Sequence, residues 1–92
     1  MSYEYTTDGR RAALCDPATG EEIARIDYRV ADAHYELDYL WVDPSRRGQG
    51  LARAMLDRFA EFVRADGGTI TAHCGVAEKM MIGDARYEDL LT

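Results

Sequence analysis

The chain up to Val42 alternates between apolar and polar side chains, and this two-residue period is typical of β-strands. The runs that alternate in this way predict strands at Tyr3–Thr7, Arg11–Cys15, Glu22–Val30 and His34–Val42. Asp16–Gly20 supplies Asp, Pro and Gly at positions that favour a turn. This part of the chain is therefore expected to form a meander of short strands.

The two longest runs each have two distinct sides. In Glu22–Val30 the apolar side is expected to face the core and the side with Arg25, Asp27 and Arg29 to face solvent. His34–Val42 places Tyr35, Leu37, Tyr39 and Trp41 on one side and Glu36, Asp38, Leu40 and Val42 on the other. The second side is thus acidic at one end and apolar at the other.

The period changes after Asp43-Pro44-Ser45, which ends the last strand. Apolar residues then recur with helical spacing at Ala52, Met55, Leu56, Phe59, Phe62 and Val63. Asp66-Gly67-Gly68 ends this helix, and Thr69–Ala72 reads as a short buried strand. Gly75–Met81 predicts a helical turn or short helix, and Tyr87–Leu91 a final short element. Strands joined through a helix lie parallel, or splay apart if they diverge.

Size and composition limit the class of protein. The 92 residues fit a single domain, and 47% hydrophobic residues are enough for a core. No apolar run approaches the roughly 20 residues of a membrane span, and the N-terminus has no signal sequence, so a soluble, cytoplasmic protein is expected. In that compartment Cys15 and Cys74 are expected to be free thiols.

The net charge of −6 argues against a general nucleic-acid binder. The densest basic pair, Arg46-Arg47, stands beside Gly48 and Gly50, directly after a strand and at the start of a helix. Backbone N–H groups of such a loop converge near the positive end of the helix, which suits a phosphate, although a tight turn alone also needs glycine. No Gly-x-x-x-x-Gly-Lys-Ser/Thr run and no third dinucleotide-binding glycine is present, so nucleotide hydrolysis and NAD chemistry are disfavoured.

Val42-Asp43-Pro44 followed by Arg47-Gly48-Gln49-Gly50-Leu51-Ala52 resembles the signature of the GNAT superfamily of N-acetyltransferases. The strand ending in Cys74 and the Tyr87-x-Asp89-Leu90-Leu91 tail are similar to its minimal, free-standing YjdJ-like branch. That branch commonly has His-Thr where this chain has Leu40-Trp41, and a proline where it has Thr71-Ala72-His73.

The resemblance implies an α/β (α+β) fold over residues 1–92: a mixed, mostly antiparallel sheet with a splayed strand pair around one main helix, and a short C-terminal helix. It also implies acetyl-CoA as cofactor. The pyrophosphate would lie on the loop, and pantetheine would pair with the preceding strand. The cofactor-binding residues would be Leu40, Trp41, Val42, Arg46, Arg47, Gly48, Gln49, Gly50, Leu51 and Ala52.

Acetyl transfer to an amine requires a base, acting directly or through water. Glu36 is the candidate base because related enzymes often carry theirs on this strand, whereas Asp38 reads more readily as a solvated carboxylate. Cys74 is the second candidate, as a leaving-group acid, a transient acyl acceptor or only a small buried side chain. His73 fits a packed, hydrogen-bonded histidine, and His34 is expected to be exposed. No metal site is expected.

These patterns leave more than one function open. An N-acetyltransferase acting on an unidentified amine is the first hypothesis. The alternatives are a non-catalytic CoA-binding module or accessory protein, and a small interaction protein whose glycine loop is only a turn. The aromatic residues of the strands fit core packing or a homodimer surface better than a nucleic-acid platform. Met80-Met81 fits either the core or the flexible lip of a pocket.

Overall fold

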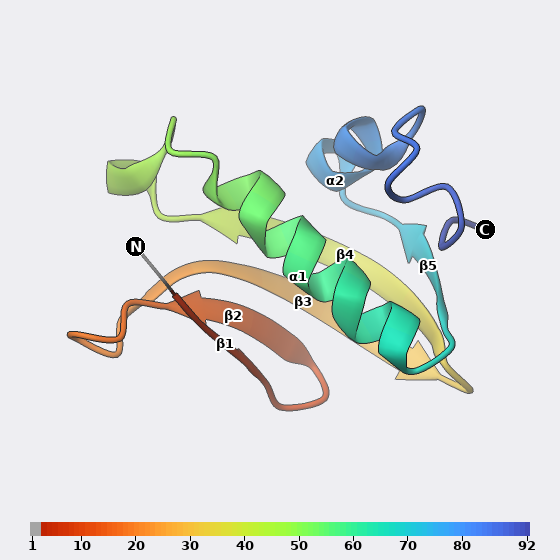
Figure 1. Ribbon diagram of the computed structural model, residues 1–92, viewed down its shortest axis with the longest axis horizontal. Helices are drawn as coiled ribbons and strands as arrows, with labels where there is room; N and C mark the ends of the chain where they lie inside the picture. The colour runs from red at the N-terminus through yellow and green to blue at the C-terminus, as the bar shows by residue number, and fades with distance from the viewer. Residues whose placement is uncertain (1–2) are drawn as a thin grey trace.

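The computed structural model describes residues 3–92, and Figure 1 shows a long helix lying across one face of a sheet. The strands are β1 (Glu4–Thr7), β2 (Arg11–Cys15), β3 (Glu22–Ala31), β4 (His34–Val42) and β5 (Thr69–Ala72). The helices are η1 (Pro44–Arg46), α1 (Leu51–Ala65) and α2 (Gly75–Met81). The predicted strands and helices are therefore confirmed to within a residue or two at their ends.

The sheet has the order β1-β2-β3-β4-β5. Neighbouring strands are antiparallel except β4 and β5, which α1 connects and which run parallel. Their pairing extends from His34 opposite Thr69 to Leu37 opposite Ala72, and beyond Leu37 the two strands separate. The predicted mixed sheet with a splayed pair is confirmed.

A β-bulge interrupts the alternation of β4. Asp27 pairs with Tyr39 whereas its neighbour Tyr28 pairs with Leu37, so Asp38 is one extra residue in β4. The side chains beyond the bulge exchange faces: Leu40 is 6% exposed whereas Tyr39 is 47% exposed. The prediction that Tyr39 shares the side of Tyr35 and Leu37 is therefore wrong, because strict alternation holds only in a strand without an extra residue.

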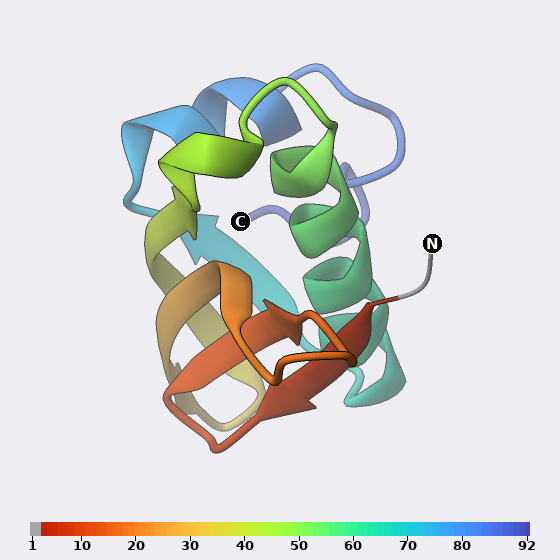
Figure 2. The same cartoon turned by 90° about the vertical axis from the view of Figure 1, so that its left-hand side faces the viewer.

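α1 faces one side of the sheet, as Figure 2 shows from the side, and the core lies between them. Tyr28 and Tyr35 of the sheet pack on Phe59 of α1, with ring centroids 5.2 and 6.0 Å away. Core packing, one of the two roles that the sequence left open, thus accounts for these aromatic residues. No helix within residues 3–92 is long and apolar enough to cross a membrane.

The chain after α2 covers the far edge of β5 without a further helix or strand. Tyr87 is 1% exposed, and Leu91 forms an isolated bridge with Ile70 of β5. The predicted final element at Tyr87–Leu91 is thus a series of turns ending in a single bridge. The segment is joined to β5 where the Ile70 N–H donates to the Leu90 carbonyl at 2.7 Å, and to α1 where Arg53 Nη1 donates to the Tyr87 hydroxyl at 3.0 Å.

Candidate active site

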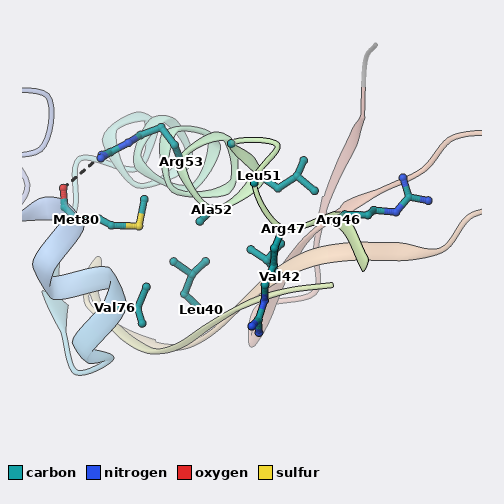
Figure 3. A pocket seen from close by; sticks show the side chains of 11 residues that line it. Leu40, Val42, Arg46, Arg47, Leu51, Ala52, Arg53, Val76 and Met80 are labelled. Atoms are coloured by element: carbon teal, nitrogen blue, oxygen red, sulfur yellow. Dashed lines mark hydrogen bonds between the residues drawn. The ribbon is translucent and has the colours of Figure 1, made fainter. Parts of the chain in front are cut away.

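A cavity of about 610 Å³ opens where the first turn of α1, the loop before it, the end of β4 and α2 meet. Its size is within the range of roughly 300–1,000 Å³ that is usual for small-molecule sites. Figure 3 shows Leu40 of β4, Val76 and Met80 of α2 and Ala52 of α1 around it. The full lining is Leu40, Val42, Arg46, Arg47, Gly48, Gly50, Leu51, Ala52, Arg53, Val76 and Met80.

The glycine loop places the start of α1 against this cavity, and no side chain within residues 3–92 caps that helix end by a hydrogen bond. Gly48 and Gly50 have φ of +84° and +74°, a conformation that other residues adopt only with strain. Gly50 is the N-cap of α1 and offers no side chain to the first-turn N–H groups. That turn contains no acidic residue either. The unpaired N–H groups and the positive end of the helix dipole together suit an anion.

The two arginines of the loop have different surroundings. Arg46 Nη2 lies 3.6 Å from Asp16 Oδ2, and its Nε lies 3.8 Å from Asp43 Oδ2. Figure 3 shows the Arg46 guanidinium turned away from Leu40, Val76 and Met80. Arg47 is exposed and forms no ion pair within residues 3–92. Arg47 is therefore the arginine of this pair whose charge remains available to a ligand.

Arg53 ties the two sides of the cavity together. Its Nη1 donates to the Met80 carbonyl at 3.3 Å, to Asp84 Oδ2 at 3.2 Å and to the Tyr87 hydroxyl at 3.0 Å. The Met80 contact is the dashed line in Figure 3. Sequence reasoning missed Arg53 and Val76. A positive charge in the first turn is unfavourable because it lies near the positive end of the helix dipole. The presence of Arg53 at this position could therefore have indicated that acidic or carbonyl groups elsewhere in the fold bind its side chain.

The predicted catalytic residues lie where β4 and β5 separate. Glu36 pairs with Thr71, and the His73 N–H donates to the Leu37 carbonyl at 2.8 Å as the last link between the strands. Cys74 follows as the half-buried N-cap of α2. Both cysteines are free thiols, as expected. Neither Glu36 nor Cys74 lines the cavity, but Cys74 is two residues from Val76, which does.

Most of the predicted cofactor-binding residues come together in this cavity, and two lie outside its lining. Leu40, Val42 and the loop line it, whereas Trp41 and Gln49 do not. Trp41 instead packs under the Arg25 guanidinium, whose central carbon is 4.9 Å from the ring centroid. A contact of Trp41 or Gln49 with a cofactor remains a prediction.

Charged side chains surround Glu36 on the sheet face opposite α1. His73 Nε2 lies 2.9 Å from Glu36 Oε1, and Arg29 Nη1 lies 3.4 Å from Glu36 Oε2. The hydrogen bond with His73 is the main cause of a pKa of Glu36 below its usual range. Arg29 also binds both oxygens of Asp38, at 2.7 and 2.8 Å, which lowers the pKa of that carboxyl as well. Both carboxylates are thus ionised at neutral pH.

The open N-terminus of α1, the cavity beside it and the two parallel strands that separate form the α+β arrangement that the resemblance to acetyltransferases implied. The chain belongs to the GCN5-related N-acetyl-transferase family, whose sequence model matches residues 3–90. Enzymes of this family are N-acetyltransferases, and acetyl-CoA is their typical acetyl donor. No curated protein is significantly similar to the chain. The finer assignment to the YjdJ-like branch remains a prediction.

Solved structures share the fold. A GCN5-like protein of the N-acetyltransferase class from Staphylococcus aureus has a TM-score of 0.75 at 24% identity, covering 97% of this chain and 87% of that one. The ribosomal-protein-S18-alanine N-acetyltransferase of Escherichia coli has a TM-score of 0.64 at 22% identity, covering 92% and 54%. The ribosomal-protein-alanine N-acetyltransferase of Brucella melitensis has 0.62 at 15%, covering 86% and 69%. At these identities the likeness concerns the fold, and the chain spans about half of the Escherichia coli enzyme.

Proposed function

We propose that this protein binds acetyl-CoA in the cavity and transfers the acetyl group to an amine. The observation that carries the proposal is that a single cavity is bounded both by the uncapped N-terminus of α1 and by the part of β4 that no longer pairs with β5. The pyrophosphate would accept hydrogen bonds from the loop and first-turn N–H groups around Gly48 and Gly50. Arg47 would add a charge-assisted contact.

The pantetheine arm would extend from the loop along β4. Beyond Leu37 that strand has β3 on one edge and no described strand on the other, so its backbone can pair with an amide-bearing chain. Leu40 and Val42 face the cavity there, opposite Val76 and Met80 of α2. A ligand in this position would reach the point of strand separation with its thiol end, next to Cys74.

The acceptor would approach from the opposite sheet face. Tyr35 and Leu37 are buried against α1, so Glu36 between them lies on the other face. In this arrangement the donor and the acceptor meet through the gap between β4 and β5, and the amine loses its proton on the face that carries Glu36.

We also propose that residues 1–92 act as one domain, that the protein is cytoplasmic and that it can form a homodimer.

Two measurements test this function. Thermal unfolding is followed with acetyl-CoA, with CoA and without ligand, and thiol release is then measured with spermidine, lysine and a peptide with a free N-terminal amine. Binding at a hundred times the dissociation constant adds about 2.7 kcal/mol to the free energy of unfolding. Stabilisation with acetyl transfer supports an enzyme. Stabilisation without transfer to any amine supports the non-catalytic CoA-binding module, and no stabilisation at millimolar CoA contradicts both.

A further inference from the structure

We infer that His73 is the group that takes the proton from the acceptor amine, and that Glu36 acts through His73 as a positioning residue. This inference rests on the proposed acetyl transfer and names the groups between which the proton of the amine moves. It departs from the sequence-based expectation that Glu36 is the base and that His73 is only a packed, hydrogen-bonded residue.

The pair is formed by the parallel register of two strands. Glu36 and His73 are 37 residues apart in the chain, yet Glu36 Oε1 lies 2.9 Å from His73 Nε2. The backbone of His73 is held by the hydrogen bond that its N–H donates to the Leu37 carbonyl, at the point where the two strands separate. The imidazole therefore stands at the edge of the gap through which donor and acceptor would meet.

The hydrogen bond also sets which nitrogen can accept a proton. An ionised carboxylate accepts hydrogen bonds, so Glu36 favours the tautomer in which His73 carries its proton on Nε2. This leaves the lone pair on Nδ1, for which no hydrogen-bond partner exists within residues 3–92. The His73 side chain is 45% exposed, so Nδ1 remains accessible to an amine or to a bridging water.

Glu36 is a poor proton acceptor in these surroundings. Its two oxygens are engaged by His73 and Arg29, and its lowered pKa means that it holds a proton weakly. An imidazole is better suited to take up and release protons near neutral pH. Two other charged groups lie near the imidazole, Arg29 of β3 and Asp38 of β4, and these two side chains pair with each other. Cys74, which carries a thiol, is the next residue after His73 in the chain.

The acceptor R–NH3⁺ gives one proton to His73 Nδ1, and the neutral amine attacks the thioester carbonyl to form the C–N bond. The C–S bond then breaks as the tetrahedral intermediate collapses. The second nitrogen proton is passed to the departing CoA thiolate, and imidazolium releases its proton to solvent. The products are the amide, CoA thiol and one proton.

The matched comparison is between the two histidines. His34 lies on the same sheet face, but Thr69 and Thr71 occupy its two ring nitrogens at 2.8 and 3.1 Å, so the expectation of a simply exposed side chain is wrong. His73→Ala is expected to lower kcat/KM by about 10²–10⁴-fold without changing acetyl-CoA affinity, and added imidazole to restore part of it. His73→Gln, which can still donate to Glu36, should be equally impaired. His34→Ala should keep wild-type turnover.

The pH profile of kcat/KM, measured with an amine that the wild type acetylates, separates a proton acceptor from a structural residue. The wild-type rate should rise with pH as the base loses its proton, and this limb should be absent in His73→Ala. Glu36→Gln should lower the rate but keep the limb, because His73 is still present to accept the proton. An intact limb in His73→Ala, or a limb lost only in Glu36→Gln, overturns the inference while the function stands. A wild type that binds acetyl-CoA but acetylates nothing overturns the proposed function itself.

Discussion

Arg46 and Asp16 form an ion pair, 3.6 Å between Nη2 and Oδ2, that ties the loop before α1 to the turn after β2. The pair brings together segments that are far apart in the sequence, and Asp43 adds a second carboxylate at 3.8 Å. The guanidinium of Arg46 is thus already engaged within the protein. The two adjacent arginines of the loop are consequently expected to have different roles, one structural and one in binding.

Arg47→Ala is expected to weaken acetyl-CoA binding by about tenfold, which corresponds to about 1.4 kcal/mol for one charge-assisted phosphate contact. Arg46→Ala should leave the affinity within about twofold because its partners are Asp16 and Asp43. Isothermal titration calorimetry of both variants at fixed ionic strength measures the difference, since salt weakens such contacts. Equal losses in the two variants would show that Arg46 leaves its carboxylates to bind the ligand.

Gly50→Ala tests the open helix N-terminus. Because Gly50 has a φ of +74°, alanine there should cost about 1–2 kcal/mol of stability, and its methyl group would enter space in which no protein atom lies within 4 Å. We expect acetyl-CoA affinity to fall by about tenfold or more as the phosphate is pushed from the N–H groups.

Gly20→Ala is the matched control, since Gly20 also has a φ of +74° and open space around it but lies in the turn between β2 and β3. It should lose similar stability and keep its affinity. Urea unfolding and calorimetry on both variants separate strain from ligand contact. An unchanged affinity in Gly50→Ala would remove the helix N-terminus from the binding site.

Local patterns were sufficient to predict the strands, α1 and the glycine loop, because each depends on residues close together in the chain. The bulge at Asp38 was not predictable in this way, since it depends on how β3 and β4 pair. It reverses the faces of Tyr39 and Leu40 and so decides that Leu40 lines the cavity. The register of β4 against β5, which joins Glu36 to His73, is likewise a property of the folded sheet.

Acid stability should depend on Asp84, which accepts hydrogen bonds from the Arg86 side chain at 2.8 and 3.1 Å and from Arg53 at 3.2 Å. The Arg86 hydrogen bonds are the main reason that the pKa of Asp84 lies at about 2 instead of 3.8. Because the folded-state pKa is the lower one, the ionised carboxylate stabilises the fold above about pH 5, and this contribution is lost as the pH falls toward 2. The stability difference between wild type and Asp84→Asn should therefore shrink over that interval.

Urea unfolding at a series of pH values measures this difference, with Glu88→Gln as a control at an exposed carboxylate in the same C-terminal segment. A difference between wild type and Asp84→Asn that does not change between pH 5 and pH 2 would mean that the Arg86 and Arg53 contacts do not favour the ionised form.

Cys74 should be shielded by bound acetyl-CoA, because it begins α2 at the point where β5 leaves β4 and stands two residues before the cavity residue Val76. Cys15 is half-buried like Cys74, but it lies at the end of β2, outside the cavity lining, and serves as the internal control. Saturating acetyl-CoA is expected to slow iodoacetamide alkylation of Cys74 by at least about tenfold, following the fraction of unbound protein, and to leave Cys15 unchanged. Mass spectrometry of the two peptides reads both rates in one sample. Cys74→Ser should then retain turnover if the thiol only forms a wall of the site, whereas a loss beyond about a hundredfold would point to an acid or acyl-acceptor role. Equal alkylation of Cys74 with and without acetyl-CoA, in protein that the ligand stabilises against heat, would place the thiol outside the site.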